Sequence, residues 1–237
     1  MMGTTLVEAR ALDISFHYSP VLRGINLKVA ARDAALIIGR NGAGKSTLLG
    51  LLAGLSSPTA GEALLFGATS RTLEPDLRRR LGLVTHQSFL YPNLTARENL
   101  EFYADLYRLD PARADIAGWI TRVGLAAAAD ERVRTFSRGM EQRLGLARAL
   151  IPAPDVLLMD EPFAALDTDG VAMLTGLLKQ ALERRCAVVI TAHEPLPLEG
   201  IGFELYEIVR GRLNGPRAIL PCGDRETGSA GSPAIAH

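Results

Sequence analysis

The sequence has no excess charge of either sign and very little cysteine. Its 26 Lys and Arg residues balance 26 Asp and Glu residues, which argues against the basic surface that nucleic-acid-binding proteins normally carry. The two cysteines, Cys186 and Cys222, have no paired spacing, so neither a zinc site nor a set of disulfides is expected. We therefore expect reduced thiols, as in a cytosolic protein, and no nucleic-acid partner.

Long apolar runs are also missing. The longest, residues 34–38 and 156–159, have the length of a strand and fall short of the roughly 20 apolar residues that cross a bilayer. The first ten residues contain Glu8 and no long apolar stretch, so we expect no signal peptide. These absences predict a chain that is soluble by itself and that can still dock on a membrane protein.

Composition and pattern favour an α/β fold. The 237 residues are 48% hydrophobic and 22% charged, which allows a sizeable core and suits one domain with a subdomain. Continuous apolar runs are typical of buried strands in a parallel sheet, and a leucine-rich helix follows the first of them. Strands are expected at about 6–16, 21–29, 34–38, 61–67, 156–160, 187–191 and 203–209, and helices at about 45–54 and 167–185.

An all-helical segment is expected to interrupt the strands over about residues 88–152. Thr95 and Glu98 form a capping-box pattern before a run of apolar residues at helical spacing. A second helix is expected to begin at Asp110-Pro111 and end at Gly124, and a third to begin at Ser137 and end at Pro152. Beyond Asn214 the chain is rich in Gly, Pro, Ser and Ala, which predicts a flexible C-terminal tail over 215–237.

The segment after the strand at 34–38 has the pattern of a phosphate-binding loop. Gly39, Gly44, Lys45 and Ser46 match G-x-x-x-x-G-K-[ST], in which glycines let backbone N–H groups point at phosphate oxygens and the next helix directs its positive dipole end there. Lys45 would reach the β- and γ-phosphates, and Ser46 would offer a hydroxyl to Mg²⁺. A chance glycine-rich turn is the alternative, but the flanking strand and helix favour Mg·ATP binding. The other loop contacts are expected from Asn41, Gly42 and Thr47.

Two acids end the apolar strand at 156–160. Acids at the carboxyl end of a parallel strand lie where α/β sheets bind ligands. Asp160 would hold Mg²⁺ through water, and Glu161 would polarise the attacking water as a general base. A strand exit with two solvated acids is the alternative.

The segment around Ser137 predicts a second anion site. A serine cap followed by Gly139 leaves a hydroxyl and backbone donors free at the start of a helix. Taken alone, this pattern favours a plain helix cap.

In order and spacing, these motifs resemble those of the ATP-binding subunit of an ABC transporter, over about residues 6–212. The resemblance implies an α/β fold with a P-loop NTPase core of ABC type, an N-terminal antiparallel β subdomain and an inserted α-helical subdomain. It places the ATPase domain at 1–214 and implies ATP and Mg²⁺ as ligands and ATP hydrolysis coupled to transport. The motifs are the phosphate loop, Gln87, Ser137–Gly139, Asp160-Glu161, Ala165-Leu166-Asp167 and His193.

The resemblance also implies roles for single residues. Phe16 would stack on adenine, with Tyr18 as a second candidate, unless Phe16 is a core residue. Gln87 would contact Mg²⁺ and couple to the membrane partner, unless it is a solvated loop residue. His193 would contact the γ-phosphate, unless it is a structural histidine.

The resemblance further implies that two chains pack head to tail and enclose two ATP molecules. Ser137 and Gly139 would bind the γ-phosphate held by the opposite chain, and Asp167 would lie in the loop that crosses the interface. Three positions depart from the family pattern: Arg138 replaces a glycine, Met140 replaces a common glutamine, and Arg40 replaces a frequent proline. None of these changes removes a catalytic group, so a competent ATPase is expected.

Residues 85–103 and 136–140 are similar to the ATP-binding subunit of the haem exporter of bacterial cytochrome c maturation, and to exporters whose signature reads Ser-x-Gly-Met. The resemblance implies separate membrane-spanning permease subunits and a place at the cytoplasmic face of a bacterial membrane. Phe89, Leu90 and Tyr91 are candidates for contact with a permease, against an equal expectation that they are core residues.

Three alternatives remain at this point. An exporter ATPase for a drug, lipid or polysaccharide would share the same motifs. So would a soluble ABC ATPase that transports nothing, such as that of iron–sulfur cluster assembly. A nucleic-acid-handling ABC protein is disfavoured because the sequence shows no coiled-coil or zinc insertion and no second cassette.

Overall fold

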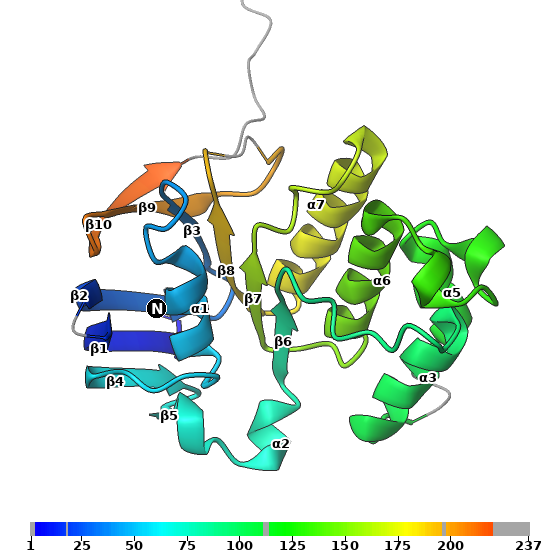
Figure 1. The fold of residues 1–237 in the computed structure, drawn as a ribbon, viewed down its shortest axis with the longest axis horizontal. Coiled ribbons are helices and arrows are strands. Elements are labelled where there is room, and N and C mark those ends of the chain that lie inside the picture. Colours follow the sequence, from blue (N-terminus) through cyan, green and yellow to red (C-terminus); the bar gives the residue numbers. More distant parts are fainter. Residues whose placement is uncertain (1–2, 18, 111–113, 196–197, 220–237) are drawn as a thin grey trace, which may run out of the picture.

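The computed structural model describes residues 3–17, 19–110, 114–195 and 198–219. Two sheets face each other across helix α1 (Lys45–Leu52), and further helices cover the outer face of the larger sheet (Figure 1). The smaller sheet is antiparallel, in the order β2-β1-β4-β5. Its strands are β1 (Thr5–Phe16), β2 (Ser19–Ala30), β4 (Ala60–Leu65) and β5 (Ala68–Thr69).

The larger sheet has the order β10-β9-β3-β8-β7-β6 and is parallel except for its edge strand β10. Alternate residues of its central strands enter two separate cores, which explains why these strands are apolar throughout. Leu36 and Met159 face the helices, whereas Ile37 and Leu158 face α1 and the smaller sheet. The strands are β3 (Ala34–Ile38), β6 (Leu81–Val84), β7 (Val156–Asp160), β8 (Ala187–Ala192), β9 (Phe203–Val209) and β10 (Arg212–Ile219).

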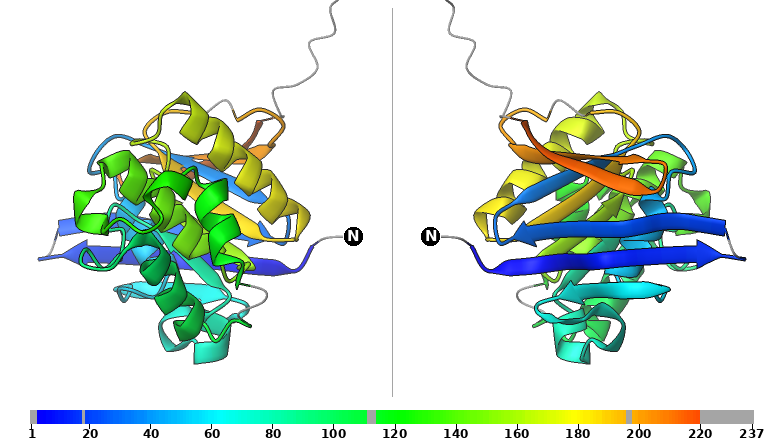
Figure 2. Two further views of the ribbon diagram at one scale, coloured as in Figure 1. Left: turned by 90° about the vertical axis from the view of Figure 1, so that its right-hand side faces the viewer. Right: turned by 90° about the vertical axis from the view of Figure 1, so that its left-hand side faces the viewer.

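A helical block lies between β6 and β7, on one side of the larger sheet (Figure 2). The predicted capping box is confirmed: Glu98 N donates to Thr95 Oγ1 at 3.1 Å, and Thr95 N donates to Glu98 Oε2 at 2.7 Å. The block comprises α3 (Ala96–Leu106), α5 (Ile116–Arg122), the 3₁₀ turns η2 (Ala126–Ala128) and η3 (Val133–Thr135), and α6 (Arg138–Leu150). Outside the block, the remaining elements are η1 (Ser70–Thr72), α2 (Pro75–Arg78) and α7 (Thr168–Glu183).

One expected boundary needs correction. The pattern predicts a tail over 215–237, but β10 runs to Ile219, and Arg217 and Ala218 pair with β9. The strand continues past Gly215-Pro216 because a shift in register between Asn214 and Arg217 accommodates these residues. The expected start of the second helix at Asp110-Pro111 falls partly on residues 111–113, which lie outside the described residues. Ala114 is helical and its N–H donates to Asp110 O at 3.0 Å, and α5 follows from Ile116 with Asp115 as its cap.

Cys186 lies at the end of the turn between α7 and β8. Its side chain is buried and free, and burial raises the pKa of its thiol to about 12. The thiol is therefore protonated at neutral pH and chemically quiet, as a structural cysteine should be. Cys222 lies outside the described residues.

Asn99 fixes the loop that precedes α3. Its side chain is fully buried, and its amide accepts from Tyr91 N at 2.8 Å and donates to Tyr91 O at 3.1 Å and Thr95 O at 2.9 Å. We expect Asn99→Ala to lower the free energy of unfolding by about 2–4 kcal/mol, because buried backbone groups lose their partners. Urea denaturation checks this, and a surface control, Asn93→Ala, should change stability by less than about 0.5 kcal/mol.

Candidate ATP-binding site

The carboxyl ends of β3, β7 and β8 meet at one edge of the larger sheet, and the phosphate loop leaves β3 there (Figure 1). The loop turns into α1 through Gly44, whose φ of +106° lies in the region that favours glycine. A Cβ on Gly44 would also lie 2.6 Å from Cδ2 of Leu22. The loop is therefore packed against β2 so closely that only glycine fits.

Lys45 is almost completely buried, with 5% of its surface exposed. Its ammonium donates to the carbonyl of Gly39 at 2.7 Å and forms an ion pair with Glu161 Oε1 at 3.1 Å. The side chain therefore folds back over its own loop, and a charge of the opposite sign balances it. A phosphate entering the loop would compete with Glu161 for this ammonium.

Asp160 and Glu161 are held by a residue that the sequence did not point to. Thr191, which is fully buried, donates through Oγ1 to Asp160 Oδ1 at 2.6 Å. It also accepts from Glu161 N, at 3.1 Å through its carbonyl and at 3.2 Å through its hydroxyl. Thr191 thus sets the positions of both acids. Its position near the end of the apolar strand β8, which pairs with β7 so that Thr191 lies opposite Asp160, is the feature that could have indicated this role.

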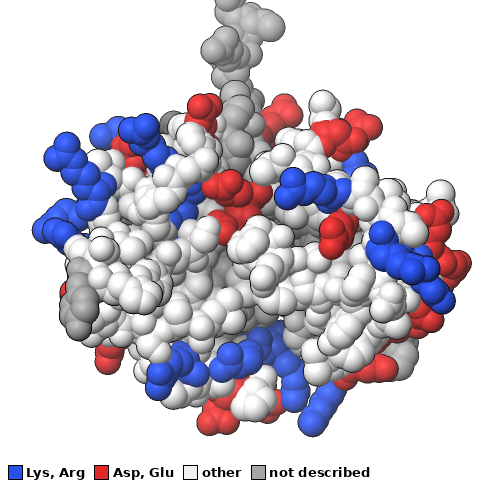
Figure 3. Space-filling model, in the orientation of Figure 1, with Lys and Arg blue, Asp and Glu red and all other residues white. Residues whose placement is uncertain are grey.

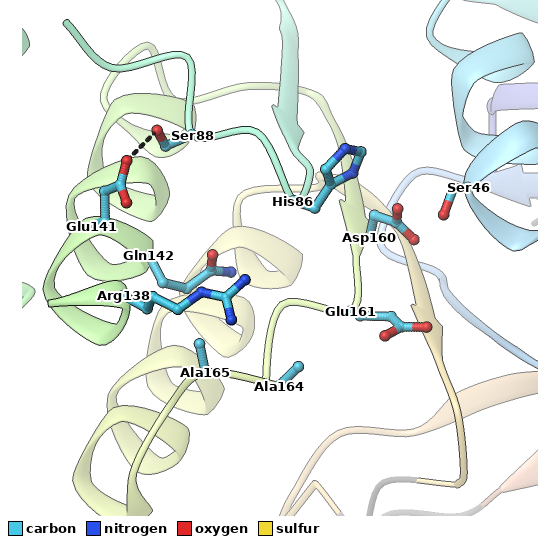
Figure 4. A pocket seen from close by; sticks show the side chains of 10 residues that line it. All are labelled: Ser46, His86, Ser88, Arg138, Glu141, Gln142, Asp160, Glu161, Ala164 and Ala165. Atoms are coloured by element: carbon cyan, nitrogen blue, oxygen red, sulfur yellow. Dashed lines mark hydrogen bonds between the residues drawn. The ribbon is translucent and has the colours of Figure 1, made fainter. Parts of the chain in front are cut away.

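A cavity of about 400 Å³ opens beside these acids (Figure 4). Ser46, Asp160 and Glu161 line one side of it, so the structure brings together the predicted metal hydroxyl and both carboxylates. Within the described ranges, no group of three or more His, Cys, Asp and Glu residues is placed to hold a metal ion by itself. A hydroxyl with one or two carboxylates suits Mg²⁺, which takes few protein ligands and completes its shell with water and phosphate oxygens. The remaining lining residues are His86, Ser88, Arg138, Glu141, Gln142, Ala164 and Ala165.

A second cavity, of about 490 Å³, runs along the phosphate loop and reaches Phe16. Phe16 is 49% exposed and so is not a core residue. An aromatic face beside a ring of backbone N–H groups fits a purine base joined to phosphates. Tyr18, the second candidate for the base, lies outside the described residues. The cavity is lined by Phe16, Val21, Asn41, Gly42, Gly44, Lys45, Ser46, Thr47 and Glu161.

Gln87 does not line either of these cavities; its neighbour His86 lines the first one. Thr85 explains this, because its hydroxyl donates to Gln87 O at 3.0 Å and accepts from Gln87 N at 3.1 Å, which turns the loop tightly. The structure therefore leaves Gln87 exposed. Its expected role at the metal stays a prediction, and His86 is a site residue that sequence reasoning missed.

Ser137 caps α6, with Oγ accepting from Met140 N at 3.3 Å. Neither Ser137 nor Gly139 lines the two cavities of its own chain. This is the arrangement expected if these residues bind an anion that another chain holds. Nearby, Arg143 Nη2 pairs with Asp167 Oδ1 at 2.6 Å, and Asp167 also caps α7 by accepting from Gly170 N. The Arg143 hydrogen bond and then the Gly170 amide hold the pKa of Asp167 below its usual value.

His193 follows β8 and lines a third cavity, of about 310 Å³, together with Glu161 and Thr191. His193 is exposed rather than packed in the core, which disfavours the alternative of a structural histidine. Its contact with a phosphate stays a prediction.

Residues 22–164 match the family model described as ABC transporter, which is more than half of the chain. The chain belongs to the ABC transporter family. It is an ATP-binding subunit, and its activity is that of an ATPase that powers transport.

Bacterial members of the ABC family are similar over most of the chain. The cytochrome c biogenesis ATP-binding export protein CcmA 2 of Cupriavidus metallidurans is 32% identical over 86% of this chain and 97% of its own length. The corresponding CcmA proteins of Salmonella typhi and Escherichia coli are each 36% identical over 81% of this chain and at least 90% of their own length. A solved structure of the ATP-binding subunit of an ABC transporter has the same fold, with a TM-score of 0.80, 23% identity and 89% coverage of both chains.

Phe16 offers a direct test of where this ABC subunit holds the base. We expect Phe16→Ala to weaken ATP binding about 10-fold, because a base stacked on an aromatic ring contributes about 1–3 kcal/mol. Calorimetric titration of the purified chain measures the change. Phe102→Ala removes a similarly exposed ring outside the cavity and should leave affinity unchanged. Normal affinity in Phe16→Ala would assign adenine to another residue.

Proposed function

We propose that this ABC ATPase drives export through separate membrane subunits in the biogenesis of c-type cytochromes, with haem as the cargo. The observation that carries the proposal is its identity of 32–36% with proteins named for cytochrome c biogenesis and export, across nearly their whole length. In the described parts of the chain, no helix is long and apolar enough to cross a membrane. We expect separate permease subunits to form the membrane path, with this chain docked on them at the cytoplasmic face of a bacterial membrane.

The chemistry at the site follows from the arrangement of its charges. ATP binds along the loop from Asn41 to Thr47, and its phosphates take over the ammonium of Lys45. Glu161, released from that ion pair, then accepts a proton from the attacking water. Thr191 supports this role, because it holds the backbone of Glu161 and leaves the carboxylate free to turn.

The donor set at the same edge supports Mg²⁺. Ser46 would offer its hydroxyl and Asp160 a carboxylate oriented by Thr191. When bound, the ion neutralises phosphate charge. Gln87 is a further ligand if its loop moves, and His193 is a candidate donor to the terminal phosphate.

The dimer completes the site. Ser137 and Gly139 are not used by their own chain's cavities, which supports contact with the γ-phosphate held by a second chain packed head to tail. Arg138 lines the cavity from the same helix start and adds a cation there (Figure 4). ATP then closes the dimer because both chains contact the same phosphate, and hydrolysis removes these contacts. Asp167 would lie in the loop at the interface.

The segment before α3 supports a contact with the membrane subunits. Phe89 and Tyr91 are 42% and 47% exposed, whereas Leu90 packs against the helical core. The core expectation therefore applies to Leu90, and the expectation of a contact with a permease applies to Phe89 and Tyr91.

Deleting the gene tests the cargo. We expect loss of c-type cytochromes, read by haem staining of gels, and rescue by the wild-type gene but not by Glu161→Gln. Normal cytochromes in the deletion strain would point to another exported substrate.

Purification in mild detergent tests the transporter itself. Recovery with soluble partners only would favour a soluble ABC ATPase.

A further inference from the structure

Thr191 is a polar residue in a strand whose other residues are all apolar. The rest of β8 consists of Ala, Val, Val, Ile and Ala, and Thr191 itself is fully buried. Valine has nearly the same shape as threonine and would fill this place without a hydroxyl. Because a hydroxyl taken out of water costs free energy unless it is hydrogen-bonded, the partners of this one indicate what it does.

Both partners of the hydroxyl are acids at the end of β7. Thr191 Oγ1 donates to Asp160 Oδ1 at 2.6 Å and accepts from Glu161 N at 3.2 Å. The directions of these bonds are fixed, because a carboxylate accepts and a backbone N–H donates. The single proton of the hydroxyl is therefore committed to Asp160, and one of its lone pairs is committed to Glu161.

The first bond restrains the carboxylate of Asp160. This residue is 8% exposed and lines the 400 Å³ cavity, where its carboxylate is turned toward the hydroxyl of Ser46 (Figure 4). Thr191 occupies Oδ1, which leaves Oδ2 for a ligand in the cavity. Hydrogen-bond partners that orient a metal ligand in this way commonly change metal affinity or activity by about 10- to 100-fold.

The second bond restrains a strained backbone. Glu161 has a φ of +48°, in the left-handed region that is unfavourable for residues other than glycine. Its N–H is shared between the carbonyl of Thr191 at 3.1 Å and the hydroxyl at 3.2 Å. In this conformation the carboxylate of Glu161 reaches the ammonium of Lys45, 3.1 Å away. Loss of the hydroxyl would let the backbone relax and move the carboxylate.

The surrounding surface gives these acids little help in binding a cation. Figure 3 shows both acidic and basic side chains around the upper centre of this face, where β7 ends. The ammonium of Lys45 also lies directly beside Glu161. A cation at Asp160 therefore depends on how its few oxygen ligands are placed, and not on a broad negative surface.

We propose that the Thr191 hydroxyl is a positioning group for ATP hydrolysis that couples the two acids, so that its loss impairs both metal binding at Asp160 and turnover through Glu161. The proposal rests on the roles proposed above for these acids and adds the residue through which they act together. It differs from a packing role, because a residue that only packs would affect stability and leave the folded protein's metal dependence unchanged.

Two substitutions separate the hydroxyl from the shape of the side chain. Thr191→Val keeps the shape and removes the hydroxyl, whereas Thr191→Ser keeps the hydroxyl and removes a methyl group. Thr175→Val is the matched control, because it removes a threonine hydroxyl whose hydrogen bond, to Val171 O at 2.8 Å, lies within α7. Each variant is made in the full chain.

Nucleotide binding with and without metal is the first measurement. The affinity for AMP-PNP, an ATP analogue that is not hydrolysed, is measured by calorimetry in EDTA and in Mg²⁺. In EDTA, Thr191→Val should bind within about 3-fold of the wild type, which also shows that it folds, because the phosphate loop is intact. In Mg²⁺ it should bind about 10-fold more weakly than the wild type, as expected when a group that orients a metal ligand is lost.

Turnover is the second measurement. At saturating Mg·ATP, kcat of Thr191→Val should fall at least about 10-fold, whereas Thr191→Ser and Thr175→Val should stay within about 3-fold of the wild type. Thr191→Val with the full gain in affinity from Mg²⁺ and a normal kcat would overturn the proposal and leave the site standing. A wild type that gains no affinity from Mg²⁺ would instead contradict the proposed metal site, and this proposal with it.

Discussion

Glu161→Gln should bind ATP at least as tightly as the wild type and hydrolyse it about 100- to 1000-fold more slowly, the usual effect of removing a general base. Glutamine keeps the size of the side chain and the backbone bonds to Thr191. It loses the negative charge that holds Lys45 at 3.1 Å in the structure. Because phosphate competes with this carboxylate for the ammonium, the neutral side chain favours nucleotide binding while it stops proton transfer.

The trapped nucleotide should also hold two chains together. Light scattering of Glu161→Gln with Mg·ATP is expected to give twice the monomer mass, and the wild type should return to monomer as ATP is consumed. Glu199→Gln, at an exposed position away from the site, is the matched control and should behave as the wild type. Normal turnover in Glu161→Gln would remove this residue from the mechanism.

The sequence predicted those parts of the site that depend on local chemistry. The phosphate loop needs glycines at fixed positions and a helix directly after a strand, and both are visible without a structure. Asp160 and Glu161 were visible in the same way, because two acids that end a buried apolar strand lie where a parallel sheet binds its ligand. The capping box at Thr95 and the serine cap at Ser137 follow from short side-chain patterns and are confirmed by their hydrogen bonds.

The features that the sequence does not predict depend on contacts between segments that are distant along the chain. Thr191 lies 31 residues from Asp160 along the chain, and only the pairing of β7 with β8 brings them together. Strand β6 is four residues long and contains Gly82, so its pattern is too short to be seen. Arg148 looked like an ordinary helix residue, and its burial against Phe89 and Tyr103 is a consequence of tertiary packing alone.

Lys45→Ala should weaken ATP binding at least 100-fold and reduce hydrolysis to a background rate. In the proposed role the ammonium would donate charge-assisted hydrogen bonds to two phosphate groups, each worth about 1.5–3 kcal/mol. Lys28→Ala removes an exposed lysine that pairs with Glu8 and should leave affinity unchanged. Calorimetric titration with Mg·ATP measures both variants, and normal affinity in Lys45→Ala would contradict the role of the loop.

The ion pair between Lys45 and Glu161 makes a sharper prediction for the double variant. In Lys45→Ala the carboxylate of Glu161 has lost its partner and faces the incoming phosphate, so part of the loss is repulsion. Adding Glu161→Gln removes that charge and should recover about 10-fold in affinity, whereas Glu161→Gln alone gains only a few-fold. The two changes are then non-additive, as expected for groups in contact. Equal effects in both backgrounds would mean that Glu161 leaves the ammonium before phosphate arrives, and that the contact in the structure does not oppose binding.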